Sequence, residues 1–169
     1  MMSAVPKAQL DFTAIDWISL DELTSPTVRL GVEHWHKLCG DRSFPAREQV
    51  KPRDIVSVLS AMSLLKVLEG GDFQYRIAGD AVVRAYDLRL QNRRLSEIEE
   101  ESASFHLFVR PVLSHVVSRR SPLALRGKIG HDARRTHFTH HENALLPLGP
   151  SDDKVDHVLV FSNYERRAV

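Results

Sequence analysis

The chain has 169 residues, 43% of them hydrophobic and 27% charged, which is typical of one globular domain with its own core. Its 23 Lys and Arg balance 22 Asp and Glu, so the charge gives no reason to expect a nucleic-acid partner, and its one cysteine, Cys39, excludes an internal disulfide. Because no apolar run reaches the roughly 18 residues of a membrane span and the N-terminus lacks the apolar core of a signal peptide, we expect a cytoplasmic protein without a membrane contact.

The first 23 residues form a leader that is too apolar for a solvated tail. Phe12, Trp17 and Leu20 are among its apolar side chains. We therefore expect residues 1–23 to dock on the rest of the chain or on a second subunit. Residues 24–164 are expected to form a single domain with an N-terminal flanking helix, and residues 165–169 a C-terminal tail.

An amphipathic helix is predicted after the leader. Thr24 and Ser25 offer hydroxyls for the N-cap, and Pro26 suits the first helical position, where its missing N–H has no effect. Apolar side chains then recur at helical spacing before Gly40, namely Val28, Val32, Trp35 and Cys39. Trp35 is expected to anchor the packing of this helix, and it is also a candidate ligand contact.

A hairpin is predicted next, with strands at 62–68 and 72–79 around the turn 69–71. A short helical turn at 55–61 precedes it. The second strand runs into Gly79 and Asp80, and the Asp80 side chain suits the N-cap of a short helix at 80–87. Tyr75 and Arg76 lie on opposite faces of that strand, so one should face the helices and the other solvent or a partner. Asp54 and Asp80 are alternative ion-pair partners for Arg76.

The longest predicted helix covers residues 102–119, with Pro111 as an irregularity that should kink it or mark its first turn. Three strands complete the chain, at 122–129, 134–147 and 155–164. His106 and Arg110 are four residues apart and therefore share one face of the long helix.

This order of two strands, helices and three strands resembles the PAS domain, and in particular the small stand-alone PAS proteins common in alphaproteobacteria. The resemblance covers about residues 28 to 164 and rests on Trp35 and Gly40, Pro45-Ala46-Arg47, Pro52-x-Asp54-Ile55, Phe73-x-Tyr75-Arg76-Ile77-x-Gly79, Leu145-Leu146-Pro147-Leu148 and Val155-Asp156-His157-Val158-Leu159. It implies an α+β fold with a five-stranded antiparallel sheet, helices on one face and an N-terminal helical extension. It also implies a bacterial signalling or regulatory role.

The resemblance leaves the ligand and any cofactor unknown. Cys39 precedes the PAS core, unlike the photoreactive thiol of flavin-binding PAS domains, and no histidine matches a haem ligand. In a PAS fold the long helix borders the central cavity, so Arg110 can hold a ligand carboxylate or phosphate beside His106. The alternative is an exposed polar helix face. The candidate ligand-binding residues are His106, Arg110, Tyr75, Arg76 and Trp35.

The nine histidines suggest a metal site as a further alternative. His137 and His141 point to one side of a predicted strand and His140 to the other. They would join His157 or Glu142 around zinc or copper only if the sheet brought them together. Their spacing matches no strong metal motif, and a solvated strand face explains them better.

The sequence thus favours a non-catalytic sensory module that binds a small molecule or a protein and signals through its flanking helices. It contains no nucleophile elbow, phosphate loop or spaced carboxylate pair, so no catalytic residue is nominated. Two alternatives remain: a ligand-free adaptor that forms a homodimer or holds a signalling protein, and a histidine-rich metal-binding protein or enzyme.

Overall fold

A computed structural model describes residues 15–128 and 137–167, except for the side chains of residues 103–108. Its centre is a six-stranded antiparallel sheet with the strand order β1-β4-β5-β6-β2-β3. The strands are β1 (Ile15–Ile18), β2 (Met62–Val67), β3 (Phe73–Ile77), β4 (Leu123–Lys128), β5 (His140–Leu148) and β6 (His157–Glu165).

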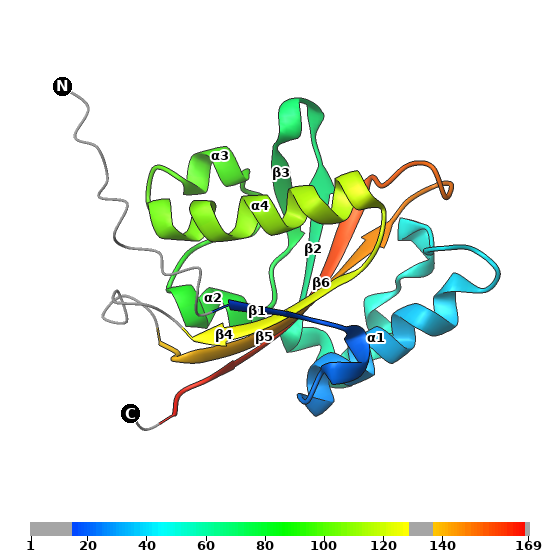
Figure 1. The fold of residues 1–169 in the computed structure, drawn as a ribbon. Coiled ribbons are helices and arrows are strands. Elements are labelled where there is room, and N and C mark those ends of the chain that lie inside the picture. Colours follow the sequence, from blue (N-terminus) through cyan, green and yellow to red (C-terminus); the bar gives the residue numbers. More distant parts are fainter. Residues whose placement is uncertain (1–14, 129–136, 168–169) are drawn as a thin grey trace.

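Helices cover both faces of this sheet. Helix α1 packs on one face, and α3 and α4 lie over the other (Figure 1). The helices are α1 (Pro26–Cys39), α2 (Asp80–Tyr86), α3 (Leu95–Ile98) and α4 (Ala103–Arg119), with 3-10 turns η3 (Leu20–Glu22), η4 (Arg47–Gln49), η5 (Pro52–Ala61) and η6 (Glu69–Gly71). The predicted α+β class with an antiparallel sheet and packed helices is confirmed. Within the described residues, no helix has the length and apolar character that a membrane span requires.

The sheet has one strand more than predicted, because part of the leader joins it. Strand β1 pairs with β4, so that Trp17 lies opposite Leu125. Strand β1 has the minimum length for an alternating pattern, and its sequence Ile-Asp-Trp-Ile does not alternate strictly, so it could not be identified from the sequence. Residues 1–14, which include Phe12, lie outside the described part of the chain.

The junction between β3 and α2 differs in detail from its prediction. Gly79, not Asp80, is the N-cap of α2, and Asp80 is the first helical residue, 3.7 Å from Arg84. A Cβ atom on Gly79 would lie 2.5 Å from the carbonyl oxygens of Ser60 and Met62. Glycine is therefore required here by the close approach of two backbone segments.

Helix α1 begins as predicted and packs unusually close to the sheet. Ser25 is its N-cap and accepts a hydrogen bond from the Val28 N–H at 3.3 Å. A Cβ atom on Gly31 would lie 2.4 Å from the Phe161 ring on β6, so this glycine lets the helix approach the strand. The Trp35 indole N–H donates to the Pro147 carbonyl oxygen at 3.1 Å. This hydrogen bond holds the C-terminal half of α1 against β5.

A buried carboxylate joins the start of α1 to the sheet. Glu142 on β5 is only 6% exposed. It accepts hydrogen bonds from the backbone N–H groups of Thr24 and Ser25, at 2.9 and 2.7 Å, and from the Thr24 hydroxyl at 2.9 Å. The Arg126 guanidinium lies 3.6 Å away. Because a helix N-terminus carries partial positive charge, the carboxylate is stabilised there and holds α1 in place.

We predict that Glu142→Gln lowers the free energy of unfolding by about 2 kcal/mol, because an amide loses the charge and offers an N–H to groups that are themselves donors. Urea denaturation measures this change. Glu33→Gln is the matched control: Glu33 is exposed on α1 and lies 3.7 Å from Lys37. This control substitution should lower the free energy of unfolding by less than about 0.5 kcal/mol. Equal effects of the two substitutions would contradict the role of Glu142.

Candidate functional site

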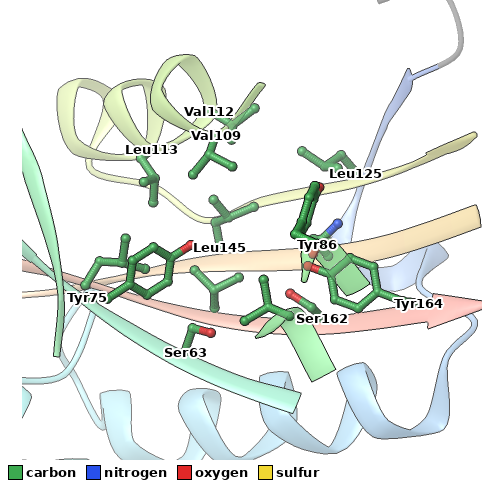
Figure 2. Close-up of a pocket in the computed structure, with 14 residues that line it drawn as sticks. Ser63, Tyr75, Tyr86, Val109, Val112, Leu113, Leu125, Leu145, Ser162 and Tyr164 are labelled. Atoms are coloured by element: carbon green, nitrogen blue, oxygen red, sulfur yellow. The ribbon is translucent and has the colours of Figure 1, made fainter. Parts of the chain in front are cut away.

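The candidate site is a cavity of about 40 Å³ between the sheet and helices α2 and α4 (Figure 2). A polar cavity needs about 10–15 Å³ to admit one water molecule, so this cavity has room for a few groups of the size of water. Its lining comprises Ser63, Leu65, Tyr75, Val82, Tyr86, Val109, Val112, Leu113, Leu125, Asn143, Leu145, Val160, Ser162 and Tyr164.

Strand alternation explains why these side chains meet. In the β5–β6 pair, Asn143 lies opposite Ser162 and Leu145 opposite Val160, and all four line the cavity. The residues between them point to the other face, where Phe161 meets α1. Helix α4 covers the cavity with its buried apolar stripe, as Figure 2 shows for Val109, Val112 and Leu113.

The cavity wall is apolar with a few neutral polar groups. All three tyrosines of the chain contribute to it, together with the hydroxyls of Ser63 and Ser162 and the Asn143 amide. Burial, reinforced by the neighbouring Tyr164, raises the pKa values of Tyr75 and Tyr86 well above the ordinary range. Burial also raises the pKa of Tyr164 to about 12, although its hydrogen bond with Ser162 opposes this shift. The three phenols are therefore uncharged at neutral pH.

An aromatic cluster lies at one end of the cavity. The Phe138 ring is 5.2 Å from that of Tyr86, 4.7 Å from that of Tyr164 and 6.0 Å from that of His141, measured between centroids. The buried His141 Nδ1 lies 2.9 Å from the Asn143 amide nitrogen, which can only donate. His141 thus orients a side chain of the cavity. Burial, with a smaller effect of His140, lowers the pKa of His141 to about 4.

The structure separates the residues that the sequence nominated for ligand binding. Tyr75 lines the cavity (Figure 2). Trp35 packs on the opposite face of the sheet through its bond to β5, and Arg76 is exposed on β3. His106 belongs to α4, but its side chain lies outside the described part of the chain.

Arg110 makes hydrogen bonds around the β2–β3 turn. Its guanidinium donates to the Gly71 carbonyl oxygen at 2.5 Å, to Asp72 at 3.0 Å and to Glu99 at 2.6 Å. Asp72 also accepts from the Ser96 hydroxyl at 2.7 Å. Burial opposes ionisation of Asp72, but its hydrogen bonds outweigh this effect and lower its pKa. Arg110 therefore holds α3, α4 and the hairpin together.

The sheet register does not bring the histidines together. His157 lies opposite Leu148, whereas His140 lies opposite Glu165 at the far end of β5. Glu142 points away from His141, because successive side chains of a strand face opposite sides. Across the described residues, no group of three or more potential metal ligands is found.

Several cavity residues were not nominated from the sequence, notably Asn143, Ser162 and Tyr164. The alternation of β6 can be read from the sequence, because Val158, Val160 and Ser162 are two residues apart and therefore share one side of the strand. The sequence does not show which side of a strand faces a helix when both sides carry apolar residues. The polar residues at 143 and 162 stand out only once β5 and β6 are paired.

Comparison with known protein families identifies a match over most of the chain. A family model described as PAS domain matches residues 23–161. The match covers most of the chain and begins just before α1, so it leaves out β1. No curated protein and no solved structure matches the chain.

The buried His141 predicts a pH dependence of stability. The imidazole of His141 takes up a proton near pH 6.5 in the unfolded chain, but only near pH 4 in the folded chain. The unfolded state therefore binds more protons between these values, and the free energy of unfolding should fall as pH falls from about 6.5 to about 4, by about 3 kcal/mol in total. Urea denaturation across this range measures it.

His141→Gln should flatten this part of the pH profile, because glutamine does not titrate. His36→Gln, an exposed position on α1, is the control and should leave the profile unchanged. If the pH profile of the His141 variant were the same as that of the wild type, groups other than His141 would cause the loss of stability at low pH.

Proposed function

The chain belongs to the PAS domain family, and on that premise we propose that it is a non-catalytic sensory module whose cavity binds a small molecule. The observation that carries this proposal is the cavity itself, in which a mostly apolar wall surrounds a few hydroxyl and amide groups. Ligand sites of proteins combine the same two elements, apolar surface for affinity and a few polar groups for orientation.

Helix α4 is the element that can report occupancy of the cavity. It supplies Val109, Val112 and Leu113 to the wall. One turn further along, its His115 contacts Trp17 of β1, with ring centroids 5.3 Å apart. A ligand that favours a different position of α4 would thus also shift β1. Signalling then follows as a change in the populations of two arrangements.

We predict that native mass spectrometry of freshly purified protein detects a bound small molecule, and that Val112→Phe abolishes it. The larger side chain fills the cavity and should destabilise the fold by only about 1–3 kcal/mol, so the variant remains folded. Val56→Phe is the matched control, because Val56 is 68% exposed. Wild-type protein without a bound molecule, or a Val112 variant that retains it, would contradict the proposal.

The coupling of α4 to β1 has its own readout. With ¹⁹F-labelled tryptophan, the Trp17 resonance should move when the bound molecule is removed, whereas the Trp35 resonance should stay nearly constant. His115→Ala should abolish the Trp17 response without releasing the molecule.

One observation favours a second function, an adaptor that forms a homodimer through β1. Strand β1 pairs with β4 on one side, and on its other side no strand pairs with it among the described residues. Trp17 on this strand is 55% exposed. An edge strand with free backbone groups and an exposed aromatic side chain can add to the sheet of a second molecule.

Deletion of residues 1–18 tests this adaptor function. We predict that the wild type is a dimer by light scattering and that the deletion yields a monomer, because it removes β1 together with the exposed Trp17 side chain. Leu30→Ser, which changes an exposed apolar residue on α1, should stay dimeric. A dimer that persists after the deletion would place the interface elsewhere.

A further inference from the structure

The geometry of the cavity also points to the chemical class of its ligand. Resting on the proposed function, we propose that the ligand is an uncharged molecule no larger than about one ring, with an apolar face and one hydroxyl or carbonyl group. Charge, polarity and size each support a part of this assignment.

The first step concerns charge. The described residues that line the cavity include no Asp, Glu, Lys, Arg or His. Arg110, which directly follows the wall residue Val109, uses its guanidinium to donate to Gly71, Asp72 and Glu99. The tyrosines remain neutral at physiological pH. A carboxylate, phosphate or ammonium group in this cavity would lose its hydration without gaining an opposite charge, which is strongly unfavourable.

The second step concerns the distribution of polar groups. Helix α4 covers the cavity with Val109, Val112 and Leu113, and hydroxyl groups lie on the opposite side (Figure 2). The hydroxyl groups of Ser63 and Ser162 are among those labelled in Figure 2. Hydroxyls both donate and accept hydrogen bonds, so they suit a ligand hydroxyl or carbonyl equally. The ligand should therefore turn its apolar face to α4 and its polar group to the sheet.

The third step concerns size. Tyr75 lies at one end of the cavity, and Tyr86 and Tyr164 lie at the other (Figure 2). These rings limit the length of a ligand, and the free volume of about 40 Å³ holds only a few atoms. A ligand of one ring needs a small outward displacement of α4. This displacement is the movement that the proposed signalling mechanism requires.

The test compares three probes of similar size in titrations of the full chain, followed by ¹H–¹⁵N spectra at neutral pH. Phenol is uncharged and has one hydroxyl, benzene has no polar group, and benzoate is an anion. We expect phenol to shift the amide signals of β5 and β6 in a saturable manner and to bind about tenfold more tightly than benzene, the gain of one hydrogen bond. Benzoate should bind at least about 100-fold more weakly than phenol, because its charge stays unpaired.

Two variants connect these results to the cavity. Val112→Phe should abolish phenol binding, whereas Val56→Phe should not. The double variant with Ser162→Ala and Tyr164→Phe removes two hydroxyls but retains the ring, so it should reduce the preference for phenol over benzene without weakening benzene binding. An unchanged preference would remove these hydroxyls from the recognition of the polar group and overturn that part of the assignment.

The outcomes separate this inference from the proposed function. Benzoate binding in the cavity, or no binding of phenol, overturns the ligand class. If native mass spectrometry still shows a molecule that Val112→Phe excludes, the sensory function stands with a different ligand. If no molecule is found but phenol binds as expected, the cavity has the stated preference and the sensory function fails.

Discussion

The carboxylate of Glu142, buried in the sheet, is the interaction on which the arrangement of the two layers depends. It accepts hydrogen bonds from two backbone N–H groups and a hydroxyl at the start of α1, so the first turn of that helix is held over β5. With α1 held there, every residue of β5 after His140 is buried, because helices lie on both sides of the strand. Loss of this contact would remove one anchor of α1 over the apolar side chains of β5 and β6 that the helix covers.

The two faces of the sheet differ in how tightly they are covered. On the α1 face, Gly31 lets the helix approach Phe161 without a gap, and Trp35 is hydrogen-bonded to the backbone of β5. On the α4 face, a cavity remains between the helix and the strands. Charged contacts hold the hairpin to α4 through Arg110, and on the β1 side the His115 ring of α4 meets the Trp17 ring. The free space beneath α4, which the close contact of α1 with Phe161 lacks, supports α4 as the element proposed to transmit a signal.

Much of the local structure could be predicted because it depends on neighbouring residues. The start of α1 at Ser25 and Pro26, the 69–71 turn and the alternation of β6 follow from capping, turn chemistry and side-chain period. The site was harder to predict. Arg110 was predicted to hold a carboxylate or phosphate of a ligand, whereas the carboxylates that it contacts in the structure belong to Asp72 and Glu99 of the chain itself. These residues are 38 and 11 positions away, and no local pattern links them.

The sequence by itself determined the α+β class, the order of the PAS elements and the buried stripe of α1, because backbone hydrogen bonding and apolar periodicity act over short distances. Only the tertiary structure decided the contacts that join distant segments. The leader adds β1 to the sheet, Glu142 caps a helix more than a hundred residues away, and the three tyrosines meet around one cavity. The physical reason is register: a shift of one residue between β5 and β6 would turn Asn143 and Ser162 away from each other, and no single strand carries that information.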